Sequence, residues 1–268
     1  MADLSSWSKI AASGADATTW LDALVTADLE GIPEGGARHS LLLSPTGSVR
    51  ADFTVANLDG DLLLLQEPSQ PRSILDLLSP YVLSSDVRLA DRSDDLALLA
   101  FPGLAKPPDV PGATPSIPSC IGRGADLIAP AIDHDRLLSA LSHEFALAAD
   151  DDVEAWRVSA GIPRFGQDVT DEDLPQEGGL EAAVSFGKGC FLGQEAVAKV
   201  RNLGHPRRAL LLVDADAPLR QGDQIFNEEA PIGAITSASG NIAIAKVRWK
   251  AREGPFRTGA GTELRVRT

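Results

Sequence analysis

The spacing of apolar residues predicts short helices alternating with antiparallel strands over the first hundred positions. Asp16 can cap a helix with an apolar face made of Trp20, Leu21, Leu24 and Val25. Asp59-Gly60 lies between two apolar runs and predicts a β-hairpin, because both residues tolerate positive φ. A short helix is predicted within 71–81, and two further strands within 87–101. This order of hairpin, helix and strand favours an α+β class over a doubly wound sheet.

The second half of the pattern predicts an irregular connection, three helices and a β-rich tail. Six prolines between Pro102 and Pro118 indicate an exposed connection without regular structure. Helices are predicted over 133–145, from 151 and from near 193. From Arg208 onward, apolar runs are separated by turn residues about every ten positions, which predicts a small β-barrel or sandwich.

Composition places the chain among globular proteins. Its 268 residues suggest about two domains, and 44% hydrophobic with 23% charged residues is ordinary for a soluble fold. The sequence shows no apolar run long enough for a membrane span, and its first ten residues lack the order of a signal peptide. We therefore expect a cytoplasmic protein without a membrane partner.

Charge is distributed unevenly along the chain. The formal net charge is −14, yet residues 188–268 hold 13 basic and 8 acidic side chains. Between Lys188 and Arg208 there are five basic residues and one acid, Glu195. This zone suits an anionic ligand, although a solvated basic face explains it equally well. Cys120 and Cys190 form neither a disulfide framework nor a paired metal motif, so reduced thiols and no metal site are expected.

The stretch FGKGCFLGQEAVAKV, residues 186–200, carries the strongest candidate chemistry. Glycines flanking Cys190 permit close approach of a ligand, and Lys188 together with a helix N-terminus favours the thiolate. The alternative is a small buried thiol, which is the usual fate of a lone cysteine. Glu195 either stabilises the N-terminus of the predicted helix through its negative charge or accepts hydrogen bonds from a planar N–H pair such as the edge of a pterin.

Other polar residues have both structural and functional interpretations. Asp52 follows a glycine turn and enters a strand, where a carboxylate satisfies turn backbone groups or forms part of a site. Arg157 sits in an apolar helical context, which favours a structural ion pair over a ligand contact. Arg201, Arg207 and Arg208 either bind an anionic tail or remain solvated. The sequence holds no P-loop, G-x-S-x-G or G-x-G-x-x-G element.

The segment KGCFLGQE, from Lys188 to Glu195, matches the signature K-G-C-[FY]-x-G-Q-E. The chain thereby resembles the YgfZ-type branch of folate-binding proteins within the glycine-cleavage T-protein superfamily. Further segments support the resemblance in the same order along the chain: Gly14–Leu29, Leu41–Phe53, Arg157–Asp168, Leu174–Glu177 and Ile232–Ala238. The resemblance therefore covers nearly the whole sequence.

The resemblance implies a ring of two ferredoxin-like α/β units followed by a small C-terminal β-barrel. Residues 1–45 with 150–205 and residues 46–149 are expected to form the two subdomains, and 206–268 the barrel. Tetrahydrofolate is expected in the central opening. The catalytic residues implied are Cys190 and Asp52. The folate-binding residues implied are Lys188, Gly189, Phe191, Gln194, Glu195, Arg157 and Arg201.

Three functions follow as hypotheses. The first is a folate-binding accessory protein for iron–sulfur cluster assembly or repair, with assembly factors or client enzymes, including tRNA-modifying ones, as partners. The second is an aminomethyltransferase, although T-proteins carry an Asp pair and R-x-E-x-G where this chain has Ala51-Asp52 and Ser159. The third is an RNA-docking protein. Direct nucleic-acid binding is not expected, because Phe226, Trp249 and Phe256 are scattered along the tail.

Overall fold

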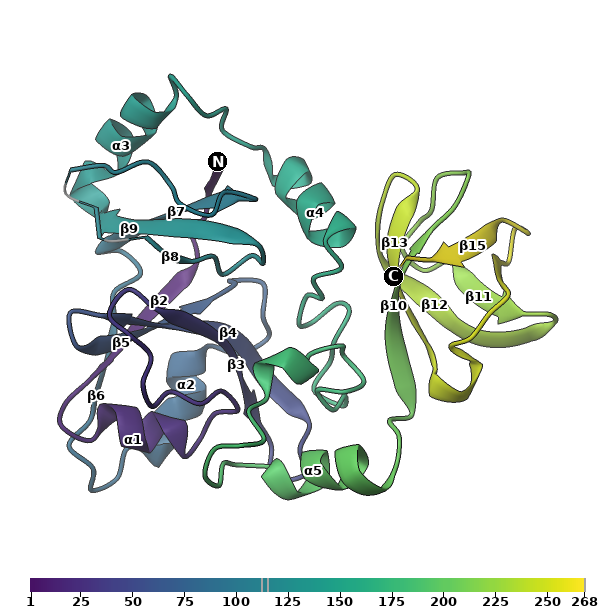
Figure 1. Ribbon diagram of the computed structural model, residues 1–268, viewed down its shortest axis with the longest axis horizontal. Coiled ribbons are helices and arrows are strands. Elements are labelled where there is room, and N and C mark those ends of the chain that lie inside the picture. The colour runs from purple at the N-terminus through teal and green to yellow at the C-terminus, as the bar shows by residue number, and fades with distance from the viewer. Residues whose placement is uncertain (112, 115, 268) are drawn as a thin grey trace. The chain divides into compact units, whose positions relative to one another are not determined.

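The computed structural model describes residues 1–111, 113–114 and 116–267. They form two compact units (Figure 1). Unit 1 comprises Met1–Leu43, Arg50–Ala149 and Ala183–Leu192. Unit 2 comprises Ser44–Val49, Asp150–Ala182 and Gly193–Thr268. This grouping differs from the predicted pairing of residues 1–45 with 150–205, and that pairing stays a prediction.

Unit 1 is built on two antiparallel sheets. The five-stranded sheet has the order β3 (Ala37–Leu43), β4 (Val49–Leu58), β5 (Asp61–Gln66), β2 (Ser8–Ser13), β6 (Arg88–Asp91). The four-stranded sheet has the order β1 (Ala2–Asp3), β7 (Leu96–Pro102), β9 (Gly124–Pro130), β8 (Ile117–Pro118). The helical segments are α1 (Ala17–Asp22), α2 (Ile74–Leu78), η1 (Ser79–Tyr81), η2 (Ala131–Asp133), α3 (His134–Leu141) and η3 (Glu181–Ala183), the last of which spans the boundary between the units.

The core of the five-stranded sheet follows from strand alternation. Ala51, Phe53 and Val55 of β4 are buried with Leu21 of α1 and Ile74 of α2 in one apolar cluster. Burying a large apolar side chain contributes roughly 1.5–3 kcal/mol, so this face fixes the register of β4. Because successive side chains of a strand point to opposite faces, the intervening Asp52 points away from these helices. The apolar pattern thus determines where this carboxylate lies.

Several predicted elements of unit 1 are confirmed. The hairpin joining β4 to β5 turns at Asp59 (φ 54°) and Gly60 (φ 83°). Asp16 is the N-cap residue of α1, although its Oδ2 accepts from the backbone of Asp86 instead of capping the helix. The two strands predicted within 87–101 are β6 and β7.

Other details of unit 1 differ from the prediction. No strand is predicted before residue 13, yet β2 lies between β5 and β6. SKIAAS holds only short apolar side chains beside Ile10, so its alternation is weak. Within the predicted range of 71–81, α2 begins only at Ile74, where Ser73 caps it by accepting from Leu75 N, and α3 ends at Leu141 instead of 145. Positions 112 and 115 of the predicted irregular connection lie outside the described residues.

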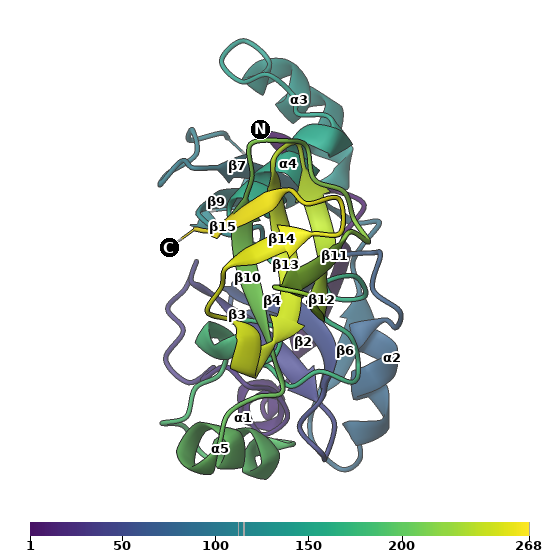
Figure 2. The same ribbon diagram turned by 90° about the vertical axis from the view of Figure 1, so that its right-hand side faces the viewer.

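Unit 2 contains two helices and a closed barrel. The helices are α4 (Asp150–Ser159) and α5 (Gln194–Leu203). The barrel, seen in Figure 2, has the strand order β10 (Arg208–Asp214), β13 (Ile242–Arg248), β12 (Ala230–Ser239), β11 (Gln224–Asn227), β14 (Phe256–Thr258), β15 (Glu263–Val266). A short 3₁₀ helix, η4 (Trp249–Ala251), follows β13. Closure leaves no unpaired sheet edge. The predicted mixed α/β class with a C-terminal barrel is confirmed.

Glycine positions the start of α5 within unit 2. Gly193 precedes the helix with φ 80°, which confirms the predicted start. The helix packs against the turn of residues 44–49, where a Cβ on Gly47 would lie 2.8 Å from the Cβ of Ala196. Gly47 also has φ 86°, so only glycine meets both requirements without strain.

Two global properties bear on function. Among the described residues, no helix is both long and apolar enough to cross a membrane. Within that same part of the chain, no group of three or more His, Cys, Asp and Glu side chains is arranged to hold a metal ion.

Candidate functional site

The loop that carries Cys190 is held in unit 1 by Lys188. The Lys188 Nζ donates to the backbone oxygens of Asp22 (2.5 Å), Val25 (3.1 Å) and Ala27 (2.6 Å), and lies 2.8 Å from Asp22 Oδ1. Its side chain is only 2% exposed. An ammonium has three donors, and four oxygens surround this one. Lys188 therefore anchors the loop to the end of α1, and its predicted role in folate binding stays a prediction.

The residues around Lys188 divide into anchored and open positions. Phe191 is buried, and Lys188 Nζ lies 5.8 Å from the centroid of its ring. Gly187 and Gly189 have open space where a Cβ would stand, and neither has a positive φ. The fold of the chain therefore does not require glycine at these two positions.

Cys190 is exposed, in contrast to the buried thiol that was the structural alternative. Cys120 is half-buried in a different environment. Burial, followed by the charge of Asp126, raises the pKa of the Cys120 thiol well above its ordinary value. Of the two cysteines, Cys190 is thus the one that a reagent or partner reaches. The central opening expected to hold tetrahydrofolate stays a prediction.

Three predicted folate-binding residues lie on α5 in unit 2. Glu195 is exposed in the first turn, and Gln194 is half-buried beside it. The N-cap is a glycine without a side chain, so the charge of Glu195 contributes to stabilising the positive end of the helix by about 0.3–1 kcal/mol. Arg201 is exposed in the last turn.

Asp52 forms a dyad with His39, a residue that the sequence analysis did not select. His39 Nε2 lies 2.5 Å from Asp52 Oδ1, with side chains 45% and 16% exposed respectively. Burial opposes the imidazolium, but the charge and hydrogen bond of Asp52 outweigh burial and raise the pKa of His39. Both side chains reach the surface of unit 1. The pair therefore offers a carboxylate and an imidazole to a ligand at one place.

Two glutamines hold the backbone of Asp52. Its N–H donates to Gln70 Oε1 (3.1 Å), and its carbonyl accepts from Gln70 Nε2 (2.5 Å). Gln66, which is buried, donates from Nε2 to Gln70 Oε1 (3.0 Å) and accepts at Oε1 from Ile74 N (2.8 Å). The dyad is thus fixed by a hydrogen-bonded chain reaching α2. Among the described residues, no hydrogen bond links this dyad to the loop of Cys190.

Arg157 of α4 is the centre of a buried network in unit 2. Its guanidinium makes five hydrogen bonds: to Glu154 (2.9 and 2.6 Å), Ile162 O (2.7 Å), Asp168 (2.8 Å) and Ser237 (2.7 Å). A guanidinium has five N–H donors, so the protein itself satisfies all of them. This arrangement agrees with the structural ion pair favoured from the sequence. A contact from Arg157 to folate stays a prediction and requires one of these bonds to break.

A further buried acid, Glu177, lies in the segment LPQE. It is 1% exposed and accepts from the N–H (2.9 Å) and Nε (3.2 Å) of Arg207. No role was predicted for Glu177 from the sequence. Arg207 therefore forms an ion pair with Glu177, although the Arg207 side chain remains 78% exposed.

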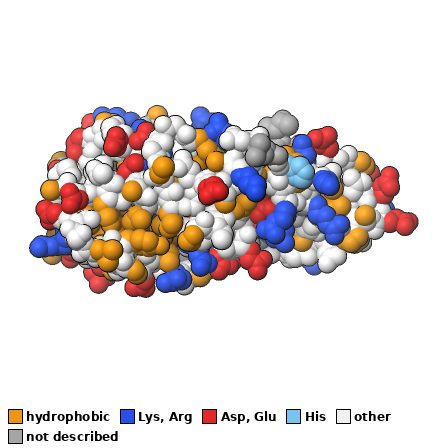
Figure 3. All heavy atoms as spheres, turned by 90° about the horizontal axis from the view of Figure 1, so that it is seen from below, with side chains coloured by type: hydrophobic (Ala, Val, Ile, Leu, Met, Phe, Trp, Pro, Cys, Tyr) orange, Lys and Arg blue, Asp and Glu red, His pale blue; other side chains and the backbone are white. Residues whose placement is uncertain are grey.

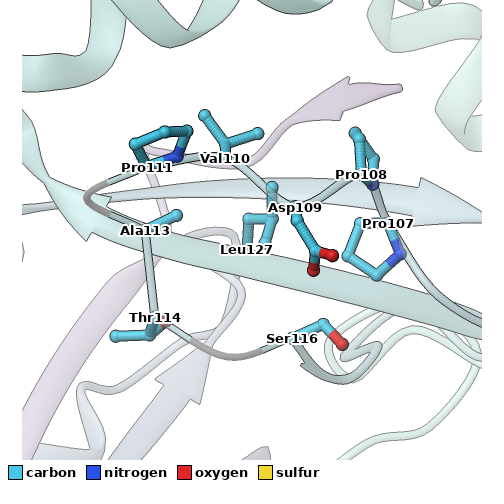
Figure 4. A pocket seen from close by; sticks show the side chains of 9 residues that line it. All are labelled: Pro107, Pro108, Asp109, Val110, Pro111, Ala113, Thr114, Ser116 and Leu127. Atoms are coloured by element: carbon cyan, nitrogen blue, oxygen red, sulfur yellow. The ribbon is translucent and has the colours of Figure 1, made fainter.

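A separate hollow of about 390 Å³ lies in unit 1 beside the proline-rich connection (Figure 4). Its walls include the apolar residues Pro107, Val110 and Leu127 and the polar residues Thr114 and Ser116. Asp109 brings a carboxylate to the hollow but pairs with Lys106 (3.1 Å). None of the predicted site residues lines this hollow.

Two family profiles match separate parts of the chain. One, described as the GCVT N-terminal domain, matches residues 1–105, and the other, the CAF17 C-terminal beta-barrel domain, matches residues 207–268. A crystal structure of the glycine cleavage system aminomethyltransferase T from Bartonella henselae matches the fold with a TM-score of 0.85. It is 20% identical and covers 100% of this chain and 84% of its own.

Named relatives fall into two groups. An aminomethyltransferase of Streptomyces avermitilis is 25% identical over 98% of this chain and 82% of its own length. The tRNA-modifying protein YgfZ of Klebsiella pneumoniae is 26% identical over 91% of this chain and 83% of its own. The fold is accordingly that of the glycine-cleavage T-protein class. Within that class, the pairing of a GCVT-type N-terminal domain with a CAF17-type barrel shows that the chain belongs to the YgfZ family.

Proposed function

We propose that this protein is a cytoplasmic tetrahydrofolate-binding accessory protein that supports assembly or repair of iron–sulfur clusters in client enzymes, including enzymes that modify tRNA. Cys190 is the residue proposed to act on the client or on an assembly factor. The name of the Klebsiella relative supports the link to tRNA modification. Membership of the YgfZ family supports the link to folate.

The exposed thiol carries the proposal. Cys190 is solvent-accessible next to Gly189, while Lys188 and Phe191 on either side are buried. A side chain needed only for packing lies inside the core, where free cysteines are usually found. This arrangement supports a role for the sulfur in contact with another molecule.

The polar groups on the protein fit the chemistry of a pterin. Asp52 Oδ1 is engaged by His39, and no described residue forms a hydrogen bond with its second carboxylate oxygen. Glu195 offers a second exposed carboxylate. Carboxylates accept the paired N–H groups of an amino-pyrimidinone edge. Bound tetrahydrofolate supplies a carrier for one-carbon units, and each of these two carboxylates is proposed separately as a group that binds and orients it.

Calorimetric titration with tetrahydrofolate tests the folate part of the proposal. We expect saturable binding by the unaltered protein and loss of at least tenfold in affinity in Glu195→Ala. Glu229→Ala, which removes an exposed carboxylate from a barrel turn, is the matched control and retains affinity. Absence of binding by the unaltered protein refutes a folate function, and equal affinity of both variants refutes the role of Glu195.

Complementation tests the thiol. In cells lacking the protein, we expect Cys190→Ser to fold, bind tetrahydrofolate and fail to restore an iron–sulfur enzyme, while Cys120→Ser restores it. Full restoration by Cys190→Ser removes the sulfur from the proposed mechanism.

An aminomethyltransferase is the second candidate function, favoured by one observation. Asp52 is kept at the position of the family's acidic motif and is held beside His39 by a rigid backbone arrangement. Relatives from Streptomyces and Listeria carry that name. Turnover of aminomethyl donors with tetrahydrofolate, lost in Asp52→Asn, supports this candidate. Rates at background for every donor reject it.

A further inference from the structure

Unit 2 presents a surface that combines cationic and aromatic side chains, here called the basic–aromatic surface. Its members are His205, Arg207, Arg208, Arg248, Trp249, Lys250 and Arg252. On this face of unit 2, Figure 3 shows Lys and Arg side chains gathered around a histidine. These residues come from the segment after α5, the first residue of β10, the last of β13, and η4 with the residue that follows it.

The barrel brings these segments together. In the antiparallel register of β10 and β13, Arg208 pairs with Arg248. Trp249 N donates to Arg207 O (2.9 Å), which extends the pairing into η4. Residues about 40 positions apart in the sequence thus share one end of a two-stranded ladder. Their proximity is a consequence of strand register and is independent of any ligand.

Two planar groups, from Arg252 and His205, lie near the Trp249 ring on this surface. The Arg252 guanidinium lies 3.9 Å from the centroid of the Trp249 ring. The His205 ring lies 6.3 Å from the Trp249 ring and is parallel to it within 9°. A hydrogen bond between His205 Nδ1 and Pro206 O (2.9 Å) fixes the orientation of the imidazole. Exposed His205 and half-buried Trp249 therefore present oriented π systems flanked by a cation.

The charge of this surface is opposite to that of the whole chain. Five cationic side chains lie here in a protein of net charge −14, and Arg207, Arg208, Arg248 and Lys250 are exposed. Acidic neighbours are present, but Glu177 and Asp173 are each only 1% exposed. Two exposed acids lie beside the cations: Glu253, paired with Arg252 at 3.1 Å, and Glu172, whose backbone oxygen accepts from Arg207 at 3.5 Å. An approaching polyanion therefore meets mainly positive charge.

We propose that the basic–aromatic surface binds a single-stranded segment of nucleic acid, with a base against the His205–Trp249 layer and phosphates at the surrounding cations. Base stacking on aromatic rings combined with phosphate contacts is how proteins bind unpaired strands. Phe226, Trp249 and Phe256 are scattered along the tail, which is why nucleic-acid binding was not expected from the sequence. His205, 44 positions before Trp249, supplies a parallel ring that the spacing of the aromatic residues does not reveal.

The layered rings favour nucleic acid over two other polyanions. An acidic protein segment or an anionic membrane would bind through the cations alone, because neither carries planar bases that stack on aromatic rings. Unpaired bases have a planar face that stacks regardless of sequence. The proposal therefore predicts a dependence on bases as well as on charge.

Fluorescence anisotropy with a labelled 12-nucleotide single-stranded RNA tests the proposal on the full chain. If all five cations reach phosphates, the slope of log affinity against log salt is about −3.5, and replacing two of them reduces it to about −2. Arg248→Gln with Lys250→Gln is the double variant, since both side chains are exposed. His205→Ala removes the outer ring and is expected to weaken binding about tenfold.

Matched variants and competitors separate this surface from general charge. Arg220→Gln and His143→Ala remove an exposed arginine and an exposed histidine elsewhere and leave affinity unchanged. Preference for the single-stranded RNA over poly-glutamate and over vesicles with anionic headgroups supports the proposal. It is overturned if the RNA does not bind, if His205→Ala binds as tightly as the unaltered protein, or if either competitor binds equally well. Tetrahydrofolate is absent throughout, so the outcome is independent of the proposed folate function.

Discussion

Replacing Asp126 by Asn removes a buried carboxylate that is poorly accommodated. Asp126 is fully buried on β9; one oxygen accepts from Cys120 N (2.8 Å), and Oδ1 has no hydrogen-bond partner. Burial is the dominant cause that raises the pKa of Asp126 to about 6 from an ordinary value of 3.8. Asn has the same shape, keeps an acceptor for Cys120 N and carries no charge. We therefore expect Asp126→Asn to stabilise the protein near neutral pH.

The magnitude follows from the two pKa values. When folding raises the pKa of an acid, its contribution to the free energy of unfolding is fully present below the pKa of the unfolded state. That contribution is lost as the pH rises through the pKa of the folded state. A shift of about two units corresponds to roughly 3 kcal/mol at pH 8, and to about 1.5 kcal/mol at pH 5 where the folded carboxyl is still protonated. The stability gained by Asp126→Asn is therefore expected to grow by about 1.5 kcal/mol between these pH values.

Urea denaturation of the unaltered protein and the variant at pH 5, 6, 7 and 8 measures this difference. Other carboxylates titrate equally in both proteins, so the difference in unfolding free energy isolates Asp126. A difference that does not change with pH refutes the reasoning, because the carboxyl then has its ordinary pKa. A variant less stable at every pH refutes it as well.

Three further predictions concern the remaining site and turn residues. Lys188→Met is expected to lower the free energy of unfolding by about 3 kcal/mol, because it removes the buried ammonium that pairs with the Asp22 carboxylate and donates to three backbone carbonyls; urea denaturation measures this, and a loss below 1 kcal/mol contradicts the anchoring role. Asp52→Asn is expected to lower the pKa of His39, since Asp52 raises it; an unchanged NMR titration of the His39 ring contradicts the dyad. Gly47→Ala is expected to destabilise more than Gly60→Ala, since both have positive φ but only position 47 meets a neighbour at 2.8 Å; equal thermal shifts contradict the packing argument.

Local sequence patterns predicted those features whose causes are local. The hairpin at Asp59-Gly60 and the start of α5 at Gly193 both depend on conformations that adjacent residues favour. The barrel followed from regularly spaced apolar runs and turns. In each case the signal lies within about ten residues of the feature it predicts.

Features that depend on contacts between distant residues were not predictable in this way. His39 meets Asp52 across two strands, and Arg157 donates to Ser237 from 80 positions away. These pairs depend on which segments of the chain become neighbours in the fold. No local sequence pattern reveals that arrangement. The same holds for His205 and Trp249.

The anchoring of Lys188 makes Cys190 a reporter of the neighbouring segment. Because the ammonium is bound to the backbone oxygens of residues 22, 25 and 27, a displacement of that stretch carries the thiol with it. The rate at which an alkylating reagent modifies Cys190 then depends on whether α1 and the residues after it are in place. A molecule that binds to unit 1 and shifts this stretch would change that rate without touching the sulfur.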